Sequence, residues 1–167
     1  MKQHVITVLS LLAVGALCTL IFAMSAQPAV ESADTSAGVS EVLARFFVPS
    51  FDALPEAQRL HWLELMDRPV RKTAHFLEYA LLGVLAFNAV IQLARERVLP
   101  VRGLGWQALA GWLFAACCGV LDEIHQGFVA GRACMPGDML LDATGALCGV
   151  LLLALVLKAL RSRVHAL

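Results

Sequence analysis

The segment RKTAHFLEYALLGVLAFNAVIQLA, residues 71–94, decides the fold of this chain. From Thr73 to Ala94 its only formally charged side chain is Glu78. A helix rises about 1.5 Å per residue, so roughly 20 apolar residues cross the hydrocarbon core of a bilayer, which is about 30 Å thick. Residues 73–94 therefore predict a transmembrane helix whose charged end lies at one membrane surface.

Three other stretches meet the same length criterion, at residues 5–24, 104–124 and 139–157. The chain has 167 residues, of which 59% are hydrophobic. A soluble domain of this size is rarely so apolar, because its surface must be wetted. We predict an all-α bundle of four transmembrane helices that forms one domain over residues 1–167.

The first stretch has an alternative interpretation as a signal peptide. Lys2 precedes it, and Ala23-Met24-Ser25 resembles a cleavage site for small residues. The apolar core of a signal peptide usually runs about 7 to 15 residues, and this one continues to Met24. The length therefore favours a retained transmembrane helix.

Basic residues beside the predicted spans indicate the orientation, because Lys and Arg are retained in the cytoplasm. These residues are Lys2 before the first span, Arg95, Arg97 and Arg102 between the second and third, and Lys158, Arg161 and Arg163 after the fourth. Both termini are therefore predicted to be cytoplasmic, although Arg71 and Lys72 oppose this at the outer end of the second span. The formal net charge is zero, which excludes nucleic acid as a partner and leaves the lipid bilayer.

The segment between the first two spans, residues 25–71, is predicted to be a long extracytoplasmic loop. Residues 27–38 are small and polar and lack the apolar content to pack. Apolar residues at helical spacing follow, at Val42, Leu43, Phe46 and Phe47 and then at Leu60, Trp62, Leu63 and Met66. They predict short amphipathic helices at the outer membrane interface, with a partner-binding helix as the alternative.

Ionisable side chains near the predicted spans are the candidate functional residues, because each costs on the order of 3 kcal/mol within hydrocarbon. The candidate pocket residues are Arg71, Lys72, His75, Glu78, Tyr79, Asp122, Glu123, His125, Gln126, Arg132, Asp138 and Asp142. Small residues continue the same helix faces and predict close packing at Gly83, Gly111, Gly145 and Gly149. The charged ends share one depth in the predicted topology, which indicates an outward-facing polar pocket. The alternative is an ion-pair network that only holds the bundle together.

Arg71, Lys72 and Arg132 suit an anionic phosphate or carboxylate, and a lipid-linked ligand would place its tail along the apolar spans. A membrane-embedded hydrolase or transferase is the alternative, with His75 or His125 as a base. No cofactor is predicted; a divalent metal remains an alternative, although the chain lacks a tight signature such as His-Glu-x-x-His. A proton-coupled transporter is disfavoured, because the helix faces below Glu78 and Asp122 turn small and apolar.

Residues 71–79, RKTAHFLEY, and residues 122–132, DEIHQGFVAGR, resemble the VanZ-like family of bacterial membrane proteins. Asp138, Asp142, Gly145 and Gly149 stand where that family has its acidic and glycine positions, and residues 22–27 resemble its serine-rich end of the first span. Ala130 and Ala26 depart from the proline and serine usual there. The resemblance implies a multi-pass protein of the bacterial cytoplasmic membrane that is connected with low-level teicoplanin resistance, without a settled biochemical activity. We therefore expect a cell-envelope protein that affects susceptibility to glycopeptides of the teicoplanin type.

Overall fold

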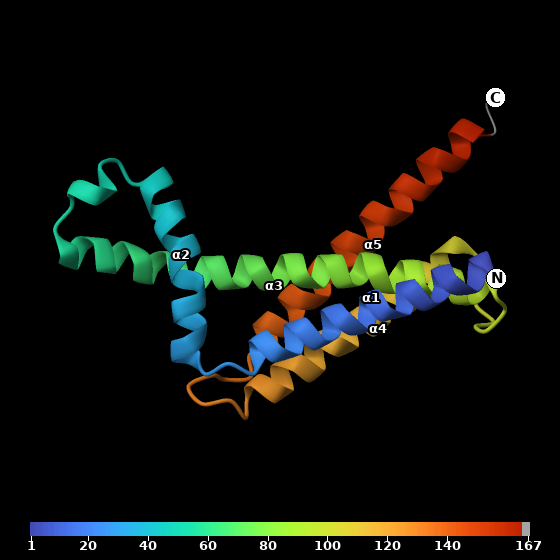
Figure 1. The fold of residues 1–167 in the computed structure, drawn as a ribbon, viewed down its shortest axis with the longest axis horizontal. Helices are drawn as coiled ribbons and strands as arrows, with labels where there is room; N and C mark the ends of the chain where they lie inside the picture. Colours follow the sequence, from blue (N-terminus) through green and yellow to red (C-terminus); the bar gives the residue numbers. More distant parts are fainter. Residues whose placement is uncertain (165–167) are drawn as a thin grey trace.

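The computed structural model describes residues 1–164, except the side chains of residues 34, 35 and 164, and this part of the chain contains no strand. Its helices, shown in Figure 1, are α1 (Lys2–Ser25), α2 (Ala29–Phe47), the short 3-10 helix η1 (Phe51–Ala53), α3 (Glu56–Arg95), α4 (Leu104–Gln126) and α5 (Pro136–Val164). Four of them, α1, α3, α4 and α5, are long and apolar enough to cross a membrane. The prediction of an all-helical chain with four such helices is confirmed.

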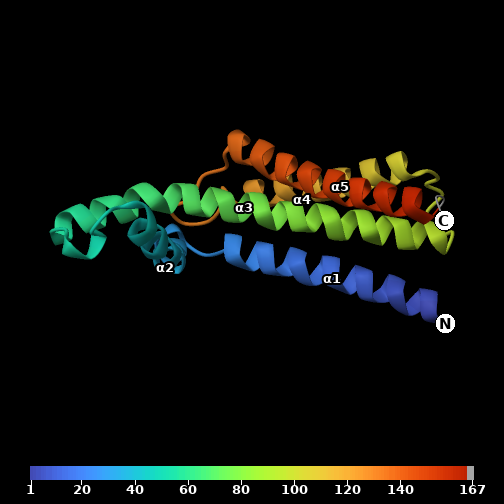
Figure 2. The ribbon, with the colours of Figure 1, turned by 90° about the horizontal axis from the view of Figure 1, so that it is seen from above.

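Helix α3 is the centre of the bundle and contacts α1, α2, α4 and α5. Figure 2 shows the two termini at one end of the bundle, which we call the terminal end. The loop between α4 and α5, residues 127–135, lies at the opposite end, which we call the loop end. The four membrane-length helices therefore alternate in direction.

Glycines set the closest helix contacts. A Cβ atom added at three positions would overlap a backbone carbonyl oxygen of the facing helix, for Gly83 that of Ala146, for Gly145 that of Phe76 and for Gly149 that of Ala80. A Cβ added at Gly111 of α4 would lie 2.6 Å from the Cα atom of Phe87 on α3. Such contacts are typical of membrane helix pairs, in which small residues let the backbones approach.

Helix α2 corrects the prediction that residues 27–38 lack the means to pack. The helix runs through most of this segment and packs on α3 with a face of small side chains at four-residue spacing. On that face Ser36, Ser40 and Ala44 are buried, and the Ser36 hydroxyl donates a hydrogen bond to Asp67 of α3. Close approach and hydrogen bonds replace the apolar bulk that the prediction required.

The second predicted amphipathic helix is also corrected, because residues 56–72 are the first part of α3 rather than a separate element. The helix continues through Pro69, which cannot donate a backbone hydrogen bond. Its 40 residues span about 60 Å, roughly twice the hydrocarbon thickness. Ala44, Val48 and Phe51 form a small core with Trp62 and Leu63, so the predicted loop is a helical hairpin that extends beyond the bundle.

A second polar cluster lies near the terminal end and corrects the prediction that the inner helix faces are only small and apolar. Gln3 donates to Gln92 (2.9 Å), Gln92 to Asn88 (3.1 Å), and Asn88 to Ser10 (3.0 Å). The cluster joins α1 to α3. A buried apolar layer that includes Val14, Ile21, Leu82 and Ala115 separates it from the polar residues at the loop end.

Candidate functional site

The predicted pocket residues lie near the loop end, a membrane thickness away from the terminal end. His75 precedes Arg95, the last residue of α3, by 20 positions, which corresponds to about 30 Å of helix. Ser25 closes α1 and Gln126 closes α4 at the same end. The site is therefore assembled at one edge of the apolar bundle.

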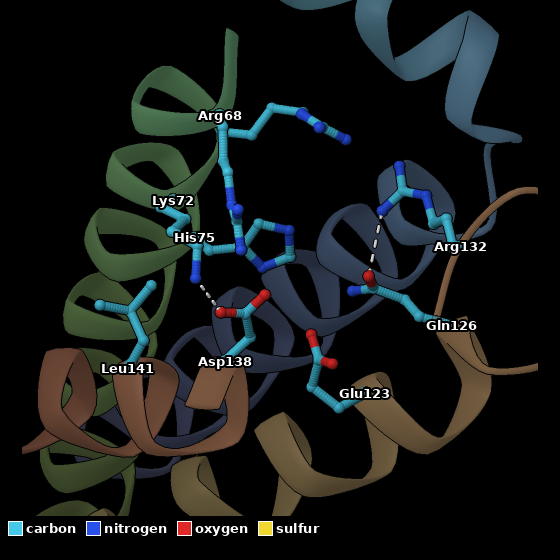
Figure 3. Close-up of a pocket in the computed structure, with 9 residues that line it drawn as sticks. Arg68, Lys72, His75, Glu123, Gln126, Arg132, Asp138 and Leu141 are labelled. Atoms are coloured by element: carbon cyan, nitrogen blue, oxygen red, sulfur yellow. Dashed lines mark hydrogen bonds and ion pairs between the residues drawn. The ribbon is translucent and has the colours of Figure 1, made fainter. Parts of the chain in front are cut away.

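A polar pocket of about 110 Å³ lies between α3, α4, α5 and the α4–α5 loop (Figure 3). We call it the polar pocket, and its lining residues are Arg68, Arg71, Lys72, His75, Glu123, Gln126, Arg132, Asp138 and Leu141. Figure 3 shows Arg68 and His75 of α3 on one side of the pocket and Arg132 of the loop on the other, with Lys72 of α3 turned toward Asp138. The basic side chains of the pocket, which we call its basic wall, thus come from two segments that are far apart in the sequence.

A hydrogen-bonded network below the pocket joins the end of α1 to α4. Asp122 accepts hydrogen bonds through Oδ2 from the hydroxyl of Ser25 (2.7 Å) and from Nε2 of Gln126 (3.0 Å). The three side chains are at most 7% exposed. A buried polar group that loses its partner costs about 1–3 kcal/mol, so these hydrogen bonds hold the end of α1 against α4.

Arg132 caps the C-terminal end of α1. Its Nε donates to the carbonyl of Gln27 (2.9 Å), its Nη2 to that of Met24 (3.5 Å), and its Nη1 to the side-chain oxygen of Gln126 (3.2 Å). Carbonyl groups at the C-terminal end of a helix carry partial negative charge, which favours a guanidinium there. Three of the five guanidinium N–H groups are used in this way, which leaves two for a ligand.

Arg132 lies in the loop, where burial and the nearby positive charge of Arg71 lower its pKa. The guanidinium still stays protonated at neutral pH, because the ordinary pKa of an arginine lies far above neutral. The backbone N–H of Ala29, the first residue of α2, also donates to the carbonyl of Ala130, which lies two residues before Arg132 in the loop (3.2 Å). The loop, α1 and α2 are thus held together around the Arg132 side chain.

Contacts between polar side chains join α3 to α5 on the other side of the pocket. Lys72 contacts the carboxylate of Asp138, and Nδ1 of His75 lies 3.8 Å from Oδ1 of Asp142. Asp142 is fully buried, and neither of its carboxylate oxygens accepts a hydrogen bond within the part of the chain that the structure describes. The contact of Gly145 with the backbone of Phe76 brings these helices close enough for both pairs.

The lining of the polar pocket is rich in positive charge. Four basic side chains line it, together with the carboxylates of Glu123 and Asp138. Asp138 is paired with Lys72, and Glu123 accepts a hydrogen bond from the backbone N–H of Met135 (3.0 Å). The arrangement favours an anion over a cation.

A second cavity of about 190 Å³, which we call the side chamber, lies between α1, α2 and α3. It shares Arg71, His75 and Arg132 with the polar pocket. The rest of its lining is Met24, Ser25, Ser32, Ser36, Val39, Val70, Ala74 and Glu78. The two cavities are therefore neighbours with a common basic wall.

The structure brings most of the predicted site residues together, but not all of them. Glu78 lines the side chamber rather than the polar pocket, and Tyr79 is buried in the apolar core at 1% exposure. His125 lies apart, because its ring stacks on Phe22 of α1 with 4.2 Å between the ring centroids. Its position three residues after Asp122 turns it toward α1 and away from both cavities.

Two polar residues of the polar pocket and of the network below it were missed from the sequence. Arg68 lies on the same face of α3 as Lys72 and His75, at positions i, i+4 and i+7, but it fell outside the predicted span. Ser25 donates the shortest hydrogen bond to Asp122, and its place at the polar end of the first span was the available signal. Both residues would have been found if the polar helix faces had been followed past the ends of the apolar runs.

Among residues 1–164, no three His, Cys, Asp or Glu side chains are arranged so that they could hold a metal ion. The two imidazoles that could serve as ligands, those of His75 and His125, lie in different surroundings. The alternative of a divalent metal site therefore has no ligand cluster in this part of the chain.

One of three comparisons with known proteins found a match. A family model described as VanZ/LLP1 matches residues 10–157, from within α1 to within α5. The match includes every residue of the two cavities. No curated protein and no solved structure matches the chain.

Proposed function

Because the chain belongs to the VanZ/LLP1 family and is a membrane protein with four membrane-length helices, we propose that its polar pocket binds the phosphate or carboxylate of a cell-envelope component. The binding would alter susceptibility to glycopeptides of the teicoplanin type. This proposal extends the family membership to a chemical role. It rests on the residues that line the pocket.

We place the protein in the bacterial cytoplasmic membrane, with both termini in the cytoplasm and the polar pocket facing outward. Basic residues at the terminal end support this orientation, among them Lys2, Arg97 and Arg161. An outward pocket is accessible to envelope components that are carried or assembled at the outer surface.

The observation that supports anion binding best is the set of N–H donors without acceptors on the basic wall. Arg68 has no ion-pair or hydrogen-bond partner within residues 1–164, and Nε of Arg71 is buried without an acceptor. Arg132 adds two unused N–H groups. Arg68 is exposed, and Nη2 of Arg71 pairs with Asp67, so the costly donor is the buried Nε of Arg71. A phosphate or carboxylate oxygen would satisfy this donor and pair with the exposed Arg68 guanidinium through charge-assisted hydrogen bonds.

Anion binding can be measured by calorimetry on the protein in phosphatidylcholine nanodiscs, with glycerol phosphate as the probe. Combined Arg68→Gln and Arg71→Gln substitution should weaken binding by about tenfold or more, because each charge-assisted hydrogen bond contributes about 1.5–3 kcal/mol. Arg161→Gln removes an exposed charge at the terminal end and is the matched control. Equal affinity in wild type and the double variant would exclude the proposal, and the polar residues would then be a structural network.

The link to antibiotic susceptibility has a separate test in cells. Expression of the wild-type protein in a susceptible bacterial host should change the inhibitory concentration of teicoplanin, and the variant with Arg68→Gln and Arg71→Gln should not. Membrane levels of the two proteins must be equal for the comparison. A variant as effective as wild type would separate susceptibility from the polar pocket.

One observation favours a second candidate, a membrane-embedded hydrolase or transferase. The buried carboxylate of Asp142 lies beside Nδ1 of His75, which lines both cavities. A carboxylate in this position can orient an imidazole and stabilise its protonated form, as a general base requires. If His75→Gln leaves the release of phosphate from lipid phosphates in nanodiscs unchanged from wild type, this candidate is eliminated.

A further inference from the structure

The side chamber differs from the polar pocket in the character of its walls. Away from the shared basic residues, its surface is mostly apolar, with Met24 of α1, Val39 of α2 and Val70 and Ala74 of α3. Val70, Ala74 and Glu78 follow each other at four-residue spacing and form one wall along α3. A small soluble anion gains nothing from such a surface, whereas a hydrocarbon chain does.

The depth of the two cavities agrees with that of a lipid headgroup. His75, which lines both, lies about 30 Å along α3 from the terminal end, and this distance equals the hydrocarbon thickness. With the terminal end at one membrane surface, the shared wall of Arg71, His75 and Arg132 lies at the level of the phosphates of the other leaflet. Below this wall, exposed apolar side chains such as Leu77 and Leu81 continue along α3.

Helix α2 borders the side chamber and carries an apolar stripe that no other helix covers. Val39 lines the chamber, and Val42 and Phe46 continue from it with exposed fractions of 65% and 81%. Figure 1 shows α2 crossing α3 rather than running parallel to it. An apolar stripe on a helix across the bundle axis fits the headgroup region of a bilayer, so the chamber beside it would be open to lipid.

From these observations we propose that the ligand of the polar pocket is a membrane lipid with a phosphate head. The phosphate occupies the polar pocket, and one hydrocarbon chain leaves through the side chamber, between α1 and α3 and beneath α2, into the bilayer. This inference rests on the proposed anion-binding function and specifies its ligand as a lipid. Glu78 can accept a hydrogen bond from a free hydroxyl next to the phosphate, as in a monoacyl glycerol phosphate.

The test compares two probes with the same phosphate head, glycerol phosphate without a chain and monooleoyl glycerol phosphate with one. Both are titrated against the protein in phosphatidylcholine nanodiscs, and empty nanodiscs correct for partitioning. Ala74→Trp fills the side chamber, so we expect it to weaken binding of the monooleoyl lipid by about tenfold or more. Binding of glycerol phosphate should change by less than about twofold.

Leu81→Trp adds a tryptophan to the exposed surface of the same helix, outside the chamber, and is the matched control. Val70→Trp fills the chamber from a second position and keeps the test decisive if Ala74→Trp unfolds the protein. If both chamber variants bind the monooleoyl lipid as wild type does, or lose both probes equally, the lipid inference is wrong. If the chamber variants bind the monooleoyl lipid as wild type does, the proposed anion-binding function still stands. If the wild-type protein binds neither probe, the anion-binding function and the lipid inference are both wrong.

Discussion

Replacing Gly145 of α5 by alanine is expected to loosen the contact between α3 and α5. The added methyl group would overlap the carbonyl oxygen of Phe76, and a backbone atom cannot move aside as a side chain does. Overpacking of this kind costs about 1–3 kcal/mol. Alanine also stabilises a helix by about 1 kcal/mol relative to glycine, so the measured loss of stability is smaller than the packing cost.

Gly15→Ala in α1 is the matched control, because no atom lies within 4 Å of a Cβ added there. The helix-propensity gain is common to both variants, so Gly145→Ala should be less stable than Gly15→Ala by about 1–3 kcal/mol. Unfolding in mixed detergent micelles, followed by helical circular dichroism, measures the difference.

The same substitution should weaken glycerol phosphate binding, because it separates Lys72 from Asp138 and His75 from Asp142. If Gly145→Ala were as stable as Gly15→Ala and bound the anion normally, the close α3–α5 contact would not exist as described.

Three further variants probe other contacts. Ser25→Ala removes the 2.7 Å hydrogen bond to Asp122 and should lower the free energy of unfolding by about 1–3 kcal/mol, whereas the exposed Ser162→Ala should leave it unchanged. Arg132→Lys keeps the charge but replaces three guanidinium nitrogens by a single Nζ, which cannot reach all three acceptors, so limited proteolysis should cut the α4–α5 loop faster; an unchanged rate would refute the capping role. Asn88→Leu breaks the link to α1 near the terminal end and should lower stability without altering glycerol phosphate affinity, and a loss of affinity would show that the two polar clusters are coupled.

The four membrane-length helices were predictable because the thickness of a bilayer imposes a length that apolar runs display directly. The boundaries of α3 were not predictable in the same way. Its first residues are polar and amphipathic, and the apolar run that marks the span begins only at Thr73. The helix continues because α2 packs along it and the small core around Phe51 and Trp62 supports its beginning.

Helix α2 shows a limit of judging packing by apolar content. Ser36, Ser40 and Ala44 are small, and their burial depends on a facing helix that the local sequence does not reveal. The hydrogen bond from Ser36 to Asp67 joins residues 31 positions apart. Contacts of this kind are tertiary, and a local pattern cannot predict them.

The grouping of ionisable residues at one end of the helices followed from helical spacing and from the short loop between α4 and α5. The sequence did not indicate which residues of that group contact each other. The acceptors of Arg132 include the backbone carbonyls of Met24 and Gln27, which every residue has and no motif marks. His125 was assigned to the pocket because it shares a helical stripe with Asp122, but the structure places its ring against Phe22 of α1.

Side-specific cysteine labelling tests most directly whether these polar side chains form an outward pocket that holds an anion. In a protein with its five native cysteines replaced by alanine, Leu141→Cys lies in the polar pocket and Lys158→Cys lies toward the terminal end. A membrane-impermeant maleimide should label position 141 in intact cells, glycerol phosphate should slow that labelling, and position 158 should react only after permeabilisation. Labelling of position 141 that requires permeabilisation, or that glycerol phosphate does not slow, would contradict the outward anion pocket.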